Sequence, residues 1–142
     1  MATVQTVKGP VDTSALGQVL MHEHVFVLSP EIDQNYPAFD EEAEVKNAIV
    51  RLNELKAAGI DTIVDLTVVG LGRYIPRIER INAEANINIV AATGLYTYDH
   101  VPHYFHFRGP GTLVNGPEVM VEMFVEDIEK GIAGTGVKAA IL

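Results

Sequence analysis

The chain has 142 residues, of which 48% are hydrophobic, so it is long and apolar enough to bury the core of one domain. Lysine and arginine number 10 against 19 acidic residues, and the net charge of -9 opposes binding to nucleic acid or anionic lipid. We therefore expect neither a nucleic acid nor a membrane as partner. The absence of cysteine excludes disulfides and thiolate sites, so a metal ion would need histidine, carboxylate or modified lysine ligands.

The chain carries no recognisable targeting segment. Its opening residues lack the apolar stretch of a secretory signal, and no apolar run reaches the roughly 18 residues that span a bilayer. These two features predict a cytoplasmic protein.

The first apolar segments predict a short hairpin and then a buried strand. Residues 3–9 and 11–19 are β-prone and are broken by Gly9-Pro10, which indicates a hairpin or an extended lead-in. Residues 19–28 are almost continuously apolar, as in a strand buried on both faces. Residues 29–40 contain two prolines and show little periodicity, so we expect a connecting loop there.

Helices and strands then alternate. Acidic residues 40–42 predict a helix start, and Gly59 predicts its end. The apolar positions between them recur at helical spacing: Val45, Ile49, Leu52 and Leu55. A second strand is predicted over 60–67, a helix over 75–81 and a third strand over 87–93.

A further helix and a fourth strand are predicted in the last part of the chain. Residues 115–118, Asn-Gly-Pro-Glu, predict a helix start, glycines within 131–136 predict its end, and residues 137–142 are again apolar. The apolar face of this helix comprises Val119, Met120, Met123, Phe124 and Ile128. The alternation predicts an α/β domain over 1–142 with a parallel sheet, which periodicity alone leaves as either an open doubly wound sheet or a closed (β/α)8 barrel.

His22-Glu23-His24 is the strongest chemical motif of the chain. Because side chains alternate along a strand, the two imidazoles should point to one face while Glu23 points to the other. Imidazole is a good ligand for zinc and similar metals, so the pair indicates a metal site. The alternative is a pair of histidines that hydrogen-bond within the core. The position near the carboxyl end of a buried strand favours the metal site.

Other polar positions carry weaker signals. Asp65 lies in an apolar strand, where we expect a structural hydrogen-bond acceptor, with Arg73 or Arg77 as possible partners, rather than a site residue. Gly70-Leu71-Gly72 follows the second strand and is interpreted as a tight turn, because Ile75 replaces the third glycine of a dinucleotide fingerprint. Lys138, at the beginning of the last strand, is assigned no role.

An aromatic and histidine-rich segment follows the third strand. Residues 96–107 occupy the position where barrel enzymes place substrate loops, so its first members could line a ligand pocket. His100, His103 and His106 recur every third residue, but Pro102 between them argues against a shared helix face and a second metal site. Solvated loop histidines or a subunit contact are the preferred interpretation.

Three segments together resemble a known family. They are LMHEHVFVL at 20–28, TIVDLTVVGLGRYIPRI at 62–78 and GLYTYDHVPHYF at 94–105. The chain resembles the phosphotriesterase family of the amidohydrolase superfamily, most closely its lactonase branch, over essentially its whole length. The resemblance implies a (β/α)8 TIM barrel, of which this chain is the N-terminal part with about three and a half βα units. It also implies a homodimer.

The resemblance implies a centre of two divalent metal ions: zinc, cobalt, iron or manganese. His22 and His24 match the metal ligands on the first barrel strand. The bridging ligand of the family is a carboxylated lysine on the fourth strand, expected just beyond Leu142, and Lys138 is not its equivalent.

The resemblance also implies catalytic and pocket residues. Tyr96 matches the tyrosine that reaches towards the bridging solvent and the substrate, and His103 stands where lactonase relatives often carry an aromatic residue. The implied substrate-binding positions are Tyr98, Phe26, Val27 and Leu71.

The function implied is hydrolysis of a small-molecule lactone or ester. The first hypothesis is a metal-dependent lactonase acting on acyl-homoserine lactones, the chemistry of quorum quenching, with promiscuous phosphotriesterase activity through a metal-bridging hydroxide. The second is a hydrolase acting mainly on organophosphates or other esters. The third is a non-catalytic barrel that binds a partner. The residues after Leu142 and comparative kinetics on a lactone and a phosphotriester would separate them.

Overall fold

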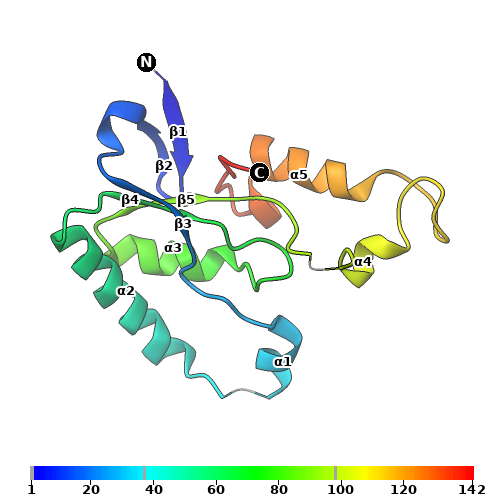
Figure 1. The fold of residues 1–142 in the computed structure, drawn as a ribbon, viewed down its shortest axis with the longest axis horizontal. Helices are drawn as coiled ribbons and strands as arrows, with labels where there is room; N and C mark the ends of the chain where they lie inside the picture. Colours follow the sequence, from blue (N-terminus) through cyan, green and yellow to red (C-terminus); the bar gives the residue numbers. More distant parts are fainter. Residues whose placement is uncertain (1, 37, 98) are drawn as a thin grey trace.

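The computed structural model describes residues 2–36, 38–97 and 99–142 (Figure 1). The chain opens with the predicted hairpin, in which β1 (Thr3–Thr6) pairs antiparallel with β2 (Gly9–Asp12). The 3-10 turn η1 (Thr13–Ala15) follows, so the second hairpin segment is shorter than predicted. The Val7 amide donates to the Ile89 carbonyl at 2.8 Å, which joins the hairpin turn to the main sheet.

The main sheet is parallel, in the order β3-β4-β5. Its strands are β3 (Val19–Glu23), β4 (Thr62–Asp65) and β5 (Asn88–Ala91). Every residue of β4, the middle strand, is buried, and Ile63 packs into the core beneath the helices. The predicted parallel α/β sheet is confirmed.

β3 ends at Glu23 and does not continue to Leu28 as predicted. A register shift between Leu20 and Glu23 interrupts the pairing with β4. The chain that follows lies beside the loop after β4, where the Leu28 amide donates to the Leu71 carbonyl at 3.0 Å. The predicted burial on both faces is also wrong, because every residue of 19–28 is half-buried or exposed.

Helices α2 (Glu41–Ala57) and α3 (Ile75–Glu84) cover one face of the sheet side by side (Figure 1). Asp40 caps α2 by accepting a hydrogen bond from the Ala43 amide at 3.1 Å. Isoleucines at helical spacing turn one face of α3 inward, as predicted. The core between helices and sheet comprises Val45, Leu52, Ile63, Ile78, Ile81, Ala85, Ile87 and Ile89.

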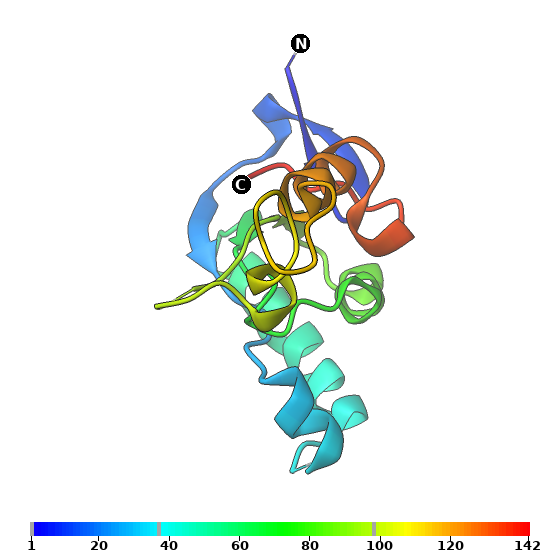
Figure 2. The same cartoon turned by 90° about the vertical axis from the view of Figure 1, so that its right-hand side faces the viewer.

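Two short helices lie where loops were predicted. Helix α1 (Pro30–Asn35) has Pro30 at its first turn, and helix α4 (His103–His106) begins after Pro102. Proline thus starts a helix in both places, although the sequence predicted loops there. The hairpin and α1 lie at opposite ends of the molecule in both views (Figures 1 and 2).

The last part of the chain contains α5 (Val119–Glu129) and the 3-10 turn η2 (Ile132–Gly134). The predicted strand over 137–142 is present only as a parallel bridge between Ala92 and Ile141 beside β5. Within the described residues, no helix combines the length and apolar character needed to cross a bilayer.

Candidate functional site

His22 and His24 lie at the carboxyl end of β3, and their rings converge. The ring centroids are 5.5 Å apart with an interplanar angle of 76°, and both side chains are exposed. Glu23, between them, is half-buried and lines a groove against α2. The prediction that the two imidazoles share one face is confirmed, and their role as metal ligands stays a prediction.

Thr67, just after β4, contacts His24 and is itself hydrogen-bonded to Asp65, the last residue of β4. Its Nδ1 lies 3.0 Å from Thr67 Oγ1, and Thr67 donates to Asp65 Oδ1 through its hydroxyl at 2.5 Å and its amide at 3.0 Å. Asp65 and Thr67 are both buried. Burial raises the pKa of Asp65 above its ordinary value, and the two hydrogen bonds from Thr67 oppose that rise.

Neither of the two arginines that were considered as partners of Asp65 pairs with it. Arg73 instead pairs with Asp127 at 2.8 Å, while the Thr93 hydroxyl donates to the same carboxylate at 2.6 Å. Arg77 pairs with Glu41 on α2 at 2.8 Å. The acceptor role predicted for Asp65 is confirmed, but a nearby hydroxyl supplies the hydrogen, because the guanidinium groups are engaged by other acids.

The three described substrate-binding candidates differ in their surroundings. The Phe26 ring packs 5.9 Å from the ring of Phe39, and the Arg77 guanidinium lies 5.0 Å from its centroid. Val27 is exposed, while Leu71 is half-buried in the turn after β4. Phe26 is therefore engaged in packing against α3, and only Val27 among the three is open to solvent.

Tyr96 projects from the chain after β5, with 53% of its surface exposed. Its amide donates to the Val69 carbonyl at 2.8 Å, which ties it to the chain after β4. A Cβ on Gly70 (φ +100°) would come 2.9 Å from the Tyr96 carbonyl oxygen, so glycine permits this close approach. The tight turn predicted at Gly70-Leu71-Gly72 is confirmed. The predicted position Tyr98 falls outside the described residues.

The histidines after β5 are placed by the short helix α4 and an aromatic neighbour. His103 and His106 share α4, contrary to the prediction, because Pro102 caps this helix rather than interrupting it. Both rings pack against Phe107, with centroid distances of 4.9 and 4.8 Å. They are therefore engaged with an aromatic neighbour.

The described residues fit part of a metal centre. They contain no group of three or more side chains of the metal-binding types. His22 and His24 supply two imidazole donors on one face, and a zinc site needs at least three protein ligands. The pair can therefore hold a metal ion only together with further ligands.

The family model of the phosphotriesterase family matches residues 2–142. The chain belongs to the phosphotriesterase family. It is 62% identical, over its whole length, to a phosphotriesterase homology protein of Mycobacterium tuberculosis (strain ATCC 25618 / H37Rv), of which it covers 44%. It is 35% identical to an aryldialkylphosphatase of Saccharolobus solfataricus, over 95% of this chain and 41% of that protein.

A solved phosphotriesterase structure has the same fold. The structure of the phosphotriesterase from Mycobacterium tuberculosis matches with a TM-score of 0.93 and 61% identity, over 97% of this chain and 43% of that one. The chain thus spans less than half the length of these relatives. Membership in the phosphotriesterase family resolves the choice that periodicity left open, because the parallel sheet is part of a TIM barrel.

Proposed function

We propose that the protein to which this chain belongs is a metal-dependent hydrolase of lactones, of the acyl-homoserine lactone type, with weaker action on phosphotriesters. The observation that carries the proposal is the convergence of the His22 and His24 rings at the carboxyl end of β3. This is the end of the strands where TIM-barrel enzymes assemble their sites. Membership in the phosphotriesterase family supports the hydrolytic chemistry.

In this proposal His22 and His24 hold part of a centre of two divalent metal ions. The bound metals would supply an activated water and polarise the carbonyl or phosphoryl oxygen of the substrate. The other ligands, including a carboxylated lysine, would come from the part of the barrel that the relatives contain and this chain does not cover. The metal would be zinc, cobalt, iron or manganese.

Tyr96 and the pocket candidates would position the substrate. The exposed Tyr96 side chain can orient the solvent or the leaving group by a hydrogen bond from its hydroxyl. Val27 offers an exposed apolar surface in the groove that His24 also lines, whereas Phe26, packed against Phe39, would shape the wall of that groove. Leu71 and Tyr98 complete the set of proposed substrate-binding residues.

Substitution of the histidines in the full-length protein tests the proposal. We expect His22→Ala and His24→Ala to lose bound metal and to lower kcat/KM on an acyl-homoserine lactone by at least about 100-fold, because a metal ligand is removed. His106→Ala, an exposed histidine on α4, is the matched control and should retain both. Metal content is measured by elemental analysis. Full metal content in either β3 variant would contradict the proposal.

A second candidate function is hydrolysis mainly of organophosphates. The 35% identity to an aryldialkylphosphatase favours it. Kinetics on a lactone and on an aryl dialkyl phosphate with one preparation separate the two functions, because the better substrate has the higher kcat/KM. Absence of both activities from metal-loaded protein would instead favour a non-catalytic barrel.

A further inference from the structure

A chain of hydrogen bonds runs from the His24 ring into the protein interior. It passes from His24 Nδ1 to Thr67 Oγ1 at 3.0 Å and from Thr67 to Asp65 Oδ1 at 2.5 Å. Thr67 is 7% exposed and Asp65 is 5% exposed, so water does not compete freely for these atoms. The threonine hydroxyl has a single hydrogen, and its direction determines what the hydroxyl can offer to the imidazole.

Asp65 is the acceptor of that hydrogen. Among the described residues, the other acceptor within reach of Thr67 Oγ1 is the Phe26 carbonyl, at the longer distance of 3.3 Å. Asp65 Oδ1 also accepts the Thr67 amide at 3.0 Å, which shows that this oxygen presents lone pairs to Thr67. With its hydrogen directed to Asp65, the hydroxyl faces His24 with a lone pair. It can therefore only accept a hydrogen from Nδ1.

We propose that Thr67, oriented by Asp65, is a positioning residue that holds His24 in the tautomer with its hydrogen on Nδ1. The lone pair of the neutral ring is then on Nε2, which becomes the ligating atom with a fixed ring orientation. The ligation step rests on the proposed function. The tautomer is a property of the metal-free protein, so it can be tested separately.

The decisive measurement is the tautomer of His24 in full-length, metal-free protein labelled with ¹⁵N. Multiple-bond ¹H–¹⁵N correlation spectra distinguish Nδ1–H from Nε2–H rings, and His24→Ala assigns the signal. We expect Nδ1–H in the wild type and in Thr67→Ser, which keeps the hydroxyl. Thr67→Val should lose this preference, because it has no acceptor for the ring hydrogen. A Thr67→Val protein that retains the Nδ1–H signature overturns the proposal.

Thr93→Val is the matched control. It also removes a hydrogen bond from a buried threonine to a buried aspartate, Asp127, at 2.6 Å. No hydrogen bond of Thr93 to a histidine occurs among the described residues. Thr93→Val should therefore keep the wild-type tautomer of His24. If Thr67→Val does not fold, Thr67→Ala replaces it, with the same expected loss and the same contradicting result.

Zinc affinity, measured by competition with a chromophoric chelator, separates this inference from the proposed function. Thr67→Val should bind zinc about 10- to 100-fold more weakly, and Thr67→Ser should bind it nearly as well as the wild type. Wild-type affinity in His22→Ala and His24→Ala would refute the metal site itself. Weakened binding in those two variants with unchanged binding in Thr67→Val would refute only the positioning role.

Discussion

At the residue scale, the convergence of the two histidines could be predicted from sequence, but the hydrogen bond between His24 and Thr67 could not. Alternation along one strand is a local rule, so it brought His22 and His24 to one face without knowledge of the fold. Thr67 is 43 residues from His24 in sequence, and only the pairing of β3 with β4 brings them together. The one available signal was that Asp65 and Thr67, like the two histidines, are two residues apart near the end of a predicted strand.

Glycine at position 72 is required by two separate constraints. Its φ is +84°, and a Cβ there would lie 2.7 Å from Leu28 Cβ and 2.8 Å from the Leu28 carbonyl oxygen. Gly111 has a similar φ of +78° but nothing within 4 Å of its Cβ position. A side chain at Gly111 would therefore meet backbone strain alone, whereas a side chain at Gly72 would meet both backbone strain and a steric clash.

We expect Gly72→Ala to destabilise the full-length protein more than Gly111→Ala. The backbone strain of alanine at positive φ costs about 1 kcal/mol at both sites, and the clash at Gly72 adds about 1 to 3 kcal/mol. Urea unfolding monitored by circular dichroism measures both variants. Equal losses of stability would show that Leu28 moves away without cost.

At the element scale, hydrophobic period predicted the alternation of strands and helices but not their ends. The isoleucine spacing in α3 reflects its contact with the sheet, a pattern that sequence records directly. The end of β3 depends on a register shift against β4, which involves residues distant in sequence. The short helices α1 and α4 were missed because each follows a proline that the sequence alone assigned to a loop.

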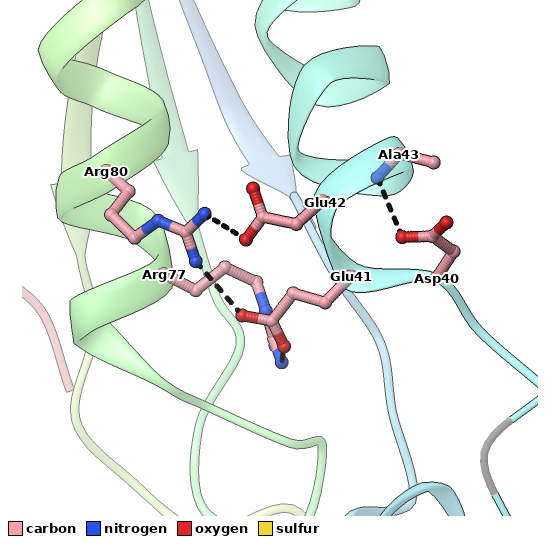
Figure 3. Close-up of polar contacts among 6 residues, drawn as sticks. All are labelled: Asp40, Glu41, Glu42, Ala43, Arg77 and Arg80. Carbon is pink, nitrogen blue, oxygen red and sulfur yellow. Dashed lines mark hydrogen bonds and ion pairs between the residues drawn. The ribbon is translucent and has the colours of Figure 1, made fainter.

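Charged side chains fasten α2 to α3 (Figure 3). Glu41 lies 2.8 Å from Arg77 and 3.4 Å from Arg80, and Glu42 lies 2.6 Å from Arg80. Hydrogen bonding from Arg77, helped by the positive charges of both arginines, lowers the pKa of Glu41 below its ordinary value of 4.5. The Glu41 side chain is 38% exposed, so solvent screens these pairs.

Glu41→Gln should reduce stability near neutral pH by less than about 1 kcal/mol. Because the folded-state pKa is lowered, this stabilisation is present above about pH 4.5 and is lost as the pH falls through the folded-state value. The difference between wild type and variant in urea unfolding should therefore shrink on acidification. Glu79→Gln, an exposed α3 residue without an ion pair among the described residues, is the control. A difference that grows on acidification would contradict the assignment.

At the scale of the whole molecule, residues 1–142 are part of a barrel and carry surfaces that a barrel would cover. Within the described residues, β3 pairs only with β4, which leaves its other edge open. Met21 on this strand is 60% exposed, and Leu142 beside β5 is 73% exposed. Open strand edges with apolar neighbours promote association between chains.

A polypeptide of residues 1–142 expressed by itself should therefore self-associate and bind a hydrophobic dye, whereas the full-length protein should do neither to the same extent. Light scattering coupled to size-exclusion chromatography and dye fluorescence measure the two effects. A monodisperse monomer of the shorter polypeptide with cooperative unfolding would show that the part is a folding unit.

The contact between the hairpin turn and Ile89 has a practical consequence for experiments on this protein. Ile89 lies near the amino end of β5, whereas the histidine pair lies at the carboxyl end of β3. Because the strands are parallel, the amino end of β5 and the carboxyl end of β3 lie at opposite ends of the sheet along the strand direction. An affinity tag or surface tether joined ahead of β1 would consequently leave the histidine face accessible to added metal and substrate.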